Sequence, residues 1–224
     1  MLFRSQDALQ RVVDPVQARL LQPLTSRQRY LARDVTVDPR PNGRPPRHTQ
    51  YRELVERDFD GWRFEIGGLV EQQLSLSLEE LRSLKVEHQI TLHKCIQGWS
   101  YVAAWQGVPL TVLLDRCRPK SSARYILFRT FDDKWEEPGH GDYYCVIDLD
   151  LARAPQTLLA YDMNGQPLPS DFGAPLRLRL ESQLGYKMVK WIRSMELIAC
   201  YQDVGAGYGG WRADLLHYSR LAPI

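Results

Sequence analysis

The chain has 224 residues and a nearly balanced charge, with 29 lysines and arginines against 27 aspartates and glutamates and a formal net charge of +2. This length is enough to bury the core of one domain, and the charge balance lacks the strong positive field that nucleic-acid binding requires. No stretch reaches the roughly 18 consecutive apolar residues of a transmembrane helix, and the N-terminus lacks the apolar region of an export signal. We therefore expect a cytoplasmic protein with no transmembrane segment and no nucleic-acid partner.

The N-terminal part of the chain has the composition of an extension. Residues 5–33 show short helical patterns interrupted by prolines, and residues 38–48 contain so much proline and glycine that regular structure is excluded. We therefore divide the chain into an N-terminal arm, residues 1–48, and one domain, residues 49–224.

That domain contains more strand patterns than helix patterns. A helix is expected at 49–59, a second begins with a capping box formed by Ser77 and Glu80, and a third opens after Pro109. Asn164-Gly165 is typical of a two-residue hairpin turn. The expected strands are 62–66, which ends at a Gly67-Gly68 turn, 86–92, 123–133, 143–150, 156–163, 175–181 and 187–198. Since helices and strands do not alternate regularly, we expect a mixed, β-rich α+β fold with much antiparallel sheet.

The four cysteines, at positions 95, 117, 145 and 200, are far apart in the sequence. They form no CxxC pair and no close Cys/His group of the kind that structural zinc needs. Independent, reduced thiols are therefore expected.

Cys95 stands in HKCIQGWS, residues 93–100, where a strand pattern gives way to a polar, aromatic turn. The residues alone leave three interpretations open. A free cysteine is often a small buried side chain. His93 is on the same face of an ideal strand, which would allow the thiolate–imidazolium pair of a cysteine hydrolase. A single thiolate is also a ligand for a soft metal.

Eight segments between residues 62 and 210 resemble those of a known family. They are WRFEIGGLV, LSLEEL, HKCIQGWS, WQGVPL, YILFRTFD, LLAYDMNGQPLP, GAPLRLRL and LGYKMVKWIRSMEL. In this order they resemble the molybdopterin-binding domain of the sulfite oxidase superfamily, nearest to the branch of the bacterial methionine-sulfoxide reductase catalytic subunit.

The resemblance implies a molybdenum–molybdopterin cofactor (Mo-MPT) whose only protein ligand to the metal is Cys95. A single thiolate bond leaves one metal position open for oxygen-atom transfer. The implied cofactor-binding residues are Cys95, Thr130, Arg177, Met188, Val189 and Lys190, with Asn42 and His48 from the arm.

Several of these residues also have an ordinary structural interpretation. Thr130 is a β-branched residue in a strand, Arg177 and Arg179 alternate in LRLRL as solvated residues would, and Lys187 has the usual character of an exposed lysine. Phe172 departs from the family, where many members have Asn or His just before the GAP motif. One polar contact to the cofactor is therefore missing or comes from elsewhere.

The residues after Cys95 bear on the substrate. Sulfite-oxidising members have arginines there, whereas this chain has IQGWSY, so the resemblance favours reduction of a sulfoxide or N-oxide. Oxidation of a sulfite-like anion, with charge from Arg193 or Arg212, is the alternative. The candidates to line a substrate pocket are Trp99, Trp105, Tyr208 and Trp211. Tyr208 is the candidate proton donor in catalysis, and His140 is a second loop candidate.

The electrons must come from another molecule. The sequence contains no haem-attachment or iron–sulfur spacing, so we expect a separate electron-transfer protein, either a cytochrome b or a flavoprotein. A non-catalytic binding or assembly module of the same fold remains a rival interpretation from a different class.

Overall fold

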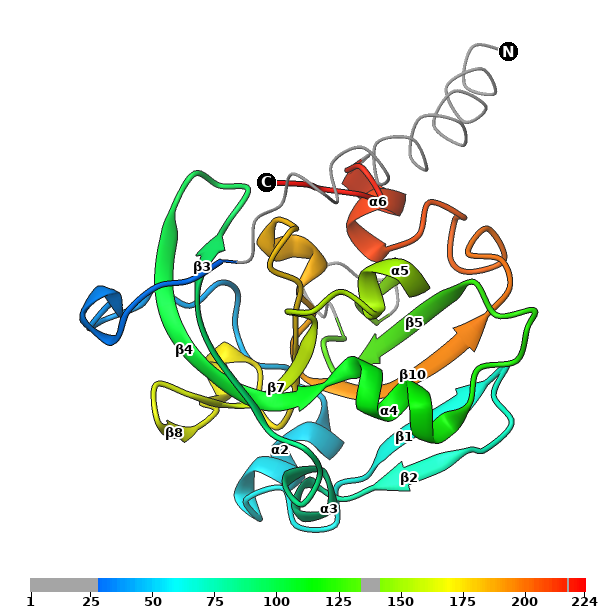
Figure 1. Cartoon of the computed structure of the whole chain (residues 1–224), viewed down its shortest axis with the longest axis horizontal. Helices are drawn as coiled ribbons and strands as arrows, with labels where there is room; N and C mark the ends of the chain where they lie inside the picture. The colour runs from blue at the N-terminus through cyan, green and yellow to red at the C-terminus, as the bar shows by residue number, and fades with distance from the viewer. Residues whose placement is uncertain (1–27, 134–141, 217) are drawn as a thin grey trace.

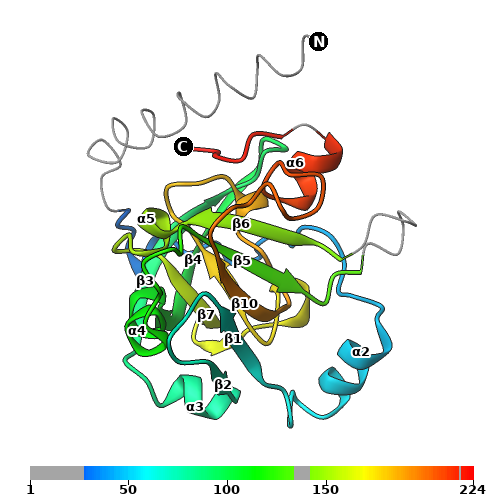
Figure 2. The ribbon, with the colours of Figure 1, turned by 90° about the vertical axis from the view of Figure 1, so that its right-hand side faces the viewer.

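The computed structural model describes residues 28–133, 142–216 and 218–224. In this part of the chain, two five-stranded sheets lie on opposite sides of the core (Figure 1). The first sheet has the strand order β2 (Leu74–Leu76), β1 (Phe64–Gly68), β10 (Ile192–Ile198), β5 (Tyr125–Thr130) and β6 (Tyr144–Asp148), all of which are visible side by side in Figure 2. Its β1 and β10 strands run parallel, and its other neighbours are antiparallel.

The second sheet is antiparallel throughout. Its strands are β3 (Glu87–Lys94), β4 (Ser100–Pro109), β7 (Leu158–Met163) and β8 (Gln166–Pro167), with β9 (Arg177–Arg179) paired to β7. Asn164 and Gly165 both have positive φ between β7 and β8, as a type I′ turn requires. The mixed, largely antiparallel architecture confirms the predicted α+β fold class.

Short helices fill the connections between the strands. They are α2 (Thr49–Glu56), α3 (Leu78–Arg82), α4 (Leu110–Cys117), α5 (Leu149–Ala152) and α6 (Trp211–Leu216), with 3-10 turns η1 (Ala32–Asp34), η2 (Ser170–Phe172) and η3 (Gly185–Lys187). α4 forms because its leucines recur at helical spacing and bury one face against the core. α3 begins with the predicted capping box of Ser77 and Glu80. None of the helices in the described ranges is both long and apolar enough to cross a membrane.

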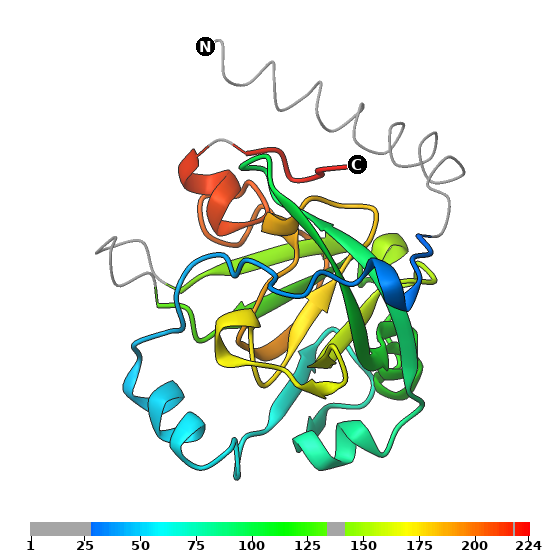
Figure 3. The ribbon, with the colours of Figure 1, turned by 90° about the vertical axis from the view of Figure 1, so that its left-hand side faces the viewer.

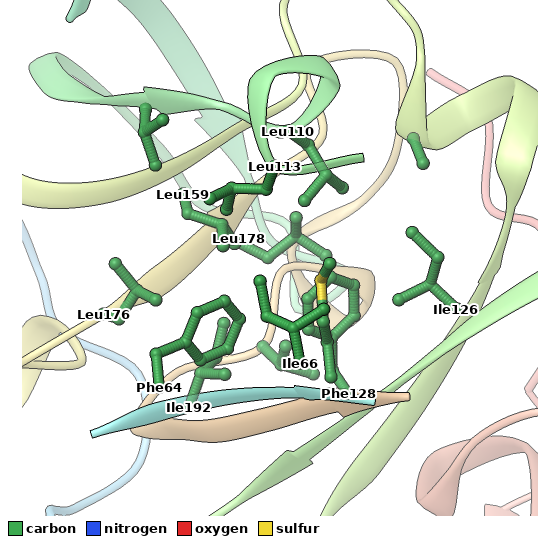
Figure 4. Packing of buried hydrophobic residues seen from close by; sticks show 14 of the residues in the cluster. Phe64, Ile66, Leu110, Leu113, Ile126, Phe128, Leu159, Leu176, Leu178 and Ile192 are labelled. Carbon is green, nitrogen blue, oxygen red and sulfur yellow. The ribbon is translucent and has the colours of Figure 1, made fainter. Parts of the chain in front are cut away.

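The main hydrophobic core lies between the two sheets (Figure 4). Phe64, Phe128 and Ile192 enter it from the first sheet, and Leu159 and Leu178 enter it from the second. Complete burial of such a side chain contributes about 1.5–3 kcal/mol to the free energy of folding. Packing of these side chains therefore fixes the position of one sheet relative to the other. The loops at their ends are thereby positioned as well.

Two predicted boundaries are wrong for a local steric reason. Gly67 and Gly68 do not form a turn but continue β1, where Gly68 has φ of +79° and pairs with Leu197. A Cβ on Gly68 would lie 2.3 Å from the Leu197 carbonyl oxygen, so glycine is needed for close approach of β10. The strand predicted at 187–198 starts only at Ile192, because Trp191 has φ of +54°.

The other differences concern element type and length. The helix α5 replaces the end of the strand predicted at 143–150, and the strand predicted at 175–181 is shortened to β9. β4 was not predicted from the sequence, although it is ten residues long. Tyr101, Val102 and Ala103 are all buried in β4, so the alternation that identifies a half-buried strand is absent.

Residues 28–36 lie along the outside of the β3–β4 hairpin, and the chain then leaves the hairpin and crosses to α2 (Figure 3). Tyr30 N–H donates to Ile90 O at 3.2 Å, and Thr36 N–H donates to Val102 O at 2.9 Å. As predicted, residues 38–48 contain neither helix nor strand. Most of the helical pieces predicted at 5–33 lie outside the described residues, and the boundary of the arm at residue 48 stays a prediction.

Candidate cofactor site

A cleft lies where the β3–β4 hairpin meets the segments before β9 and β10. It is lined by His93, Trp99, Tyr101, Asp171, Phe172, Arg177, Gly185, Met188, Lys190 and, from the N-terminal segment, Asn42. Its space is about 40 Å³, which is smaller than a molybdopterin, so the cofactor would extend beyond it. Two larger grooves, of about 740 and 700 Å³, run along α3–α4 and along β1–β10; neither contains a predicted cofactor-binding residue, and Arg193 lines the second.

Cys95 occupies the loop that joins β3 to β4. Its N–H donates to Trp99 O at 2.9 Å, and Gly98 N–H donates to Cys95 O at 3.1 Å, which closes a tight loop. Thr91, His93 and Cys95 are buried in turn while the residues between them are more exposed, so Cys95 ends the inward-facing row that contributes His93 to the cleft. Cys95 is 7% exposed as a residue, and its Sγ lies 3.9 Å from Gln97 Oε1.

Arg177 brings a buried positive charge to the cleft wall. Its side chain is 2% exposed, and its Nη1 donates to Phe172 O at 2.9 Å. Its Nε is buried without a hydrogen-bond partner within the described residues. Burial lowers the pKa of Arg177 to about 10, so the guanidinium stays charged at neutral pH. A buried donor with no acceptor marks a place where an anionic or carbonyl-rich ligand would be stabilised.

Lys190 stands beside Arg177 at the cleft. Its Nζ donates to Asn42 O and to Asp171 O, so it ties the N-terminal segment to η2. A Cβ on Gly173 would lie 2.8 Å from Lys190 Cβ, and Gly173 has φ of +116°. The glycine of the GAP motif is therefore required both for its backbone conformation and for the approach of Lys190.

A buried ion pair lies behind the cleft. Arg179 is fully buried, and its Nε and Nη2 donate to the two carboxylate oxygens of Glu181 at 2.9 and 2.8 Å. Its Nη1 lies 3.1 Å from His93 Nδ1. Trp105 packs beneath both arginines, with its ring centroid 4.8 Å from the Arg177 guanidinium and 4.3 Å from that of Arg179. The interpretation of these arginines as solvated strand residues is therefore wrong.

The same contacts bear on the cysteine-hydrolase interpretation. Burial, followed by the charges of Arg179, Arg177 and Lys190, lowers the pKa of His93 well below its ordinary value. The imidazole is then neutral at pH 7, whereas a thiolate–imidazolium pair needs it charged. No hydrogen bond between His93 and Cys95 is found in the described part of the chain.

Some residues predicted for the site lie elsewhere. The Thr130 hydroxyl in β5 donates to Tyr143 O at 2.7 Å and accepts from Asp132 N–H at 3.2 Å, so its bonds serve the first sheet. His48 precedes α2 at the surface. Tyr208 is 41% exposed on the loop between β10 and α6, and it does not line the cleft. Their roles at the cofactor stay predictions.

The remaining candidates divide between the cleft and the core. Met188 lines the cleft, and Val189 follows it as a buried residue. Lys187, expected to be exposed, is buried and donates from Nζ to Val146 O at 3.0 Å, so that expectation is wrong. Trp105 and Trp211 are each 1% exposed and belong to the core, which leaves Trp99 at the cleft. His140 lies outside the described residues.

The Arg179–Glu181 pair and the cleft residues Tyr101 and Asp171 were not predicted from the sequence. A signal existed in β3, where the apolar Ile90 and Leu92 alternate with the polar Thr91 and His93. The structure buries the polar face, with Thr91 and His93. Such an inversion of apolar and polar faces is expected where a polar network supports a site.

Comparison with known proteins identifies the family. Residues 51–203 match a family described as "Oxidoreductase molybdopterin binding domain". The chain belongs to this family. The match confirms the resemblance to the sulfite oxidase superfamily and, for the family's domain, the expected Mo-MPT cofactor.

Similar proteins of this family carry reductase names. The chain is 38% identical over 144 residues to the protein-methionine-sulfoxide reductase catalytic subunit MsrP of Xanthomonas axonopodis pv. citri, a match that covers 61% of this chain and 45% of that protein. It is 36% identical over 149 residues, 66% of this chain and 53% of that protein, to a protein of Azospira oryzae provisionally named protein-methionine-sulfoxide reductase subunit YedZ1. The chain thus spans about half the length of these curated relatives.

A solved structure of similar fold is that of sulfane dehydrogenase SoxCD from Paracoccus pantotrophus. The TM-score is 0.55 at 21% identity, and the similarity covers 66% of this chain and 41% of that chain. At this identity the likeness shows the fold alone, and it confirms the predicted sulfite-oxidase-type architecture.

The cleft has the donor set that the family's cofactor needs. Arg177 has a buried Nε without an acceptor, Lys190 adds a second cation, and Cys95 supplies one soft ligand at the end of the row that contains His93. Phe172 is the position that does not fit, since it presents a ring where a polar side chain would contact the cofactor. The residues as a set fit a molybdopterin.

Proposed function

We propose that this chain catalyses oxygen-atom transfer at Mo-MPT, in the direction of sulfoxide or N-oxide reduction. The observation that carries the proposal is a cleft whose wall contains a buried arginine with an unused donor, together with the buried Cys95, which does not itself line the cleft but follows the cleft residue His93 by two positions. The names of the similar proteins, which refer to methionine-sulfoxide reductase, support the direction of the reaction.

In this proposal the protein binds the cofactor and orients it. Cys95 holds the metal, while Arg177, Lys190 and the backbone at 188–190 hold the pterin and its phosphate. When bound, the cofactor supplies two-electron chemistry coupled to the gain or loss of one oxygen atom. Trp99 lines the cleft with an uncharged ring that suits a neutral sulfoxide better than a sulfite dianion, and the Arg40 guanidinium lies 5.5 Å from the centroid of that ring.

Oxidation of a sulfite-like anion has less support. Arg193 pairs with Asp142 at 3.2 Å, and Arg212 stacks on Trp211 at 5.0 Å. Neither arginine lines the cleft. A non-catalytic module of the same fold would have no need for a buried arginine with an unused donor, because such a group is costly without a ligand.

The electron donor belongs to the same proposal. We propose a separate electron-transfer protein, a cytochrome b or a flavoprotein, because the relatives named as catalytic subunits imply at least one further subunit. The cytoplasmic location expected from the sequence stays a prediction, which cell fractionation would test.

The decisive experiment compares the wild type with Cys95→Ser, both expressed in a host that makes molybdopterin. We expect close to one molybdenum per wild-type chain and reduction of dimethyl sulfoxide or trimethylamine N-oxide by reduced viologen dye. In Cys95→Ser we expect at least a 100-fold loss of this activity, because a serine hydroxyl is a poor ligand for a soft metal centre.

Cys200→Ser is the matched control. Cys200 is a free, partly exposed thiol whose Sγ contacts Gln202 Oε1 at 2.8 Å, away from the cleft. It should retain both metal and activity. A well-folded wild type without molybdenum or pterin would refute the proposal.

A further inference from the structure

His93 ends a chain of buried charged groups that the proposed role of Cys95 does not use. Glu181 accepts two hydrogen bonds from Arg179, and Arg179 reaches His93 Nδ1 at 3.1 Å. His93 is 4% exposed, Arg179 is 0% exposed and Glu181 is 5% exposed. Gln89 Nε2 also donates to Glu181 Oε1 at 2.9 Å, so the carboxylate is held from two sides.

These contacts decide which ring nitrogen of His93 carries the proton. A guanidinium has only donors, so the contact with Arg179 requires Nδ1 to be the acceptor. The proton must then be on Nε2. The paired carboxylate keeps Arg179 in place, and therefore the ring has one fixed orientation.

The protonated edge of the ring packs against Gly185, another residue of the cleft wall. His93 lines the cleft together with Gly185, and a Cβ on Gly185 would lie 2.6 Å from Nε2 and 2.5 Å from Cε1. Any other residue at 185 would collide with this edge. Tyr101 stacks on the ring with centroids 4.9 Å apart, so one face of the imidazole is packed, and the Nε2 edge lies against Gly185 in the cleft wall.

We propose that His93 donates a hydrogen bond from Nε2 to the molybdopterin, and that Arg179 and Glu181 are positioning residues for it. The proposal rests on the proposed function, since it needs the cofactor in this cleft. It assigns the inverted face of β3 a role: the row that ends at the metal ligand Cys95 also carries a cofactor-binding donor two residues earlier.

The test compares cofactor release from His93→Leu and His93→Gln with the wild type. Each protein is purified with cofactor and diluted, and the remaining molybdenum and pterin are followed over time by mass spectrometry and by fluorescence of the oxidised pterin. The leucine variant lacks the donor, and we expect release at least tenfold faster. The glutamine amide carries one acceptor and one donor, as the neutral ring does, so its release rate should stay within about threefold of the wild type. His88→Leu, which removes an exposed histidine from the same strand, should change nothing.

A second measurement needs no variant that could misfold. Nitrogen-15 NMR of the wild-type protein, prepared with cofactor and from a host that makes none, should show His93 protonated at Nε2 in both forms. Its Nε2–H signal should shift and become protected from exchange when the cofactor is bound, while the His88 signals stay unchanged.

The outcomes separate the two proposals. Wild-type protein that holds molybdopterin, with equal release rates in wild type and His93→Leu or an unshifted Nε2–H signal, would overturn the role of His93 and leave the proposed function intact. Wild-type protein that holds no molybdopterin would overturn both.

Discussion

At the scale of single residues, Phe172 distinguishes this cleft from the pattern of its family. The half-buried ring packs edge-on against Tyr101, with centroids 6.0 Å apart, and its backbone carbonyl accepts the Arg177 hydrogen bond. We predict that Phe172→Asn slows the release of molybdopterin severalfold, because the amide adds a donor and an acceptor at the cleft. The same change should lower the free energy of unfolding by about 0.5–1.5 kcal/mol through loss of the aromatic pair.

Phe172→Leu is the control for that prediction. It removes the ring without adding a hydrogen-bonding group, so it should lower stability without improving retention of the cofactor. Release measured by molybdenum content and unfolding measured in urea give the two results. Equal release rates in the two variants would count against a missing polar contact at this position.

Single residues also show how much of the candidate site could be predicted from the sequence. Arg177, Met188, Lys190 and Asn42 were predicted from the motifs, and the structure places them around one cleft. Thr130 has its hydroxyl bonded within the first sheet, a contact that depends on a segment 13 residues away. Spacing in a sequence locates a residue on a strand, but it does not show which groups fold against that residue.

At the scale of secondary-structure elements, the sequence predicted correctly the features that depend only on neighbouring residues. The capping box of α3, the type I′ turn at Asn164-Gly165 and the apolar face of α4 all depend on residues within one or two turns of the chain. β3 was located from its alternation, but the burial of His93 was not predicted, because His93 packs against Arg179 from a distant strand. β4 was missed because it is covered on both faces.

The capping box of α3 supports a prediction of how the stability of the protein depends on pH. Glu80 accepts from Ser77 N–H at 2.7 Å and pairs with Arg63 at 3.1 Å, and mainly the backbone hydrogen bond lowers the pKa of Glu80 below its ordinary value of 4.5. The folded state therefore favours the charged form. This contribution to stability is fully present above the pKa of Glu80 in the unfolded chain. It is lost as the pH falls through the lower pKa of Glu80 in the folded chain.

We predict that wild type is more stable than Glu80→Gln at pH 7 and that this difference shrinks as the pH falls below about 4.5, the ordinary pKa of glutamate. Urea unfolding at a series of pH values measures it. Glutamine can still accept the Ser77 bond, so the comparison isolates the charge. Glu79→Gln removes an exposed charge from the same turn and serves as the reference. A difference that grows on acidification would contradict the prediction.

At the scale of the whole molecule, the cleft joins parts of the chain that the sequence keeps far apart. Asn42 comes from the N-terminal segment, His93 from the second sheet, and Lys190 from the approach to β10 in the first sheet. The fold class was predictable because the strand patterns and the order of the motifs were informative. The way in which the core brings these three parts together was not, since it depends on packing between the two sheets.

This arrangement predicts that the cofactor stabilises the folded chain as a whole. A ligand that binds only the folded state adds about 2.7 kcal/mol when its free concentration is 100 times its dissociation constant. For a chain of this size that corresponds to a rise in Tm of roughly 5–10 °C. We expect protein from a host without molybdopterin to have a lower Tm by about this amount, as measured by calorimetry.

Hydrogen exchange would locate the effect. Loaded protein should exchange more slowly at 93–101 and 185–190, which border the cleft, and equally at 78–82 in α3, which borders a different groove. The reason is that a ligand bridging the two sheets suppresses openings that separate them, whereas local fraying of α3 leaves the cleft intact. An equal Tm with and without cofactor, or protection spread evenly over α3 and the cleft, would show that the cofactor does not bridge these segments.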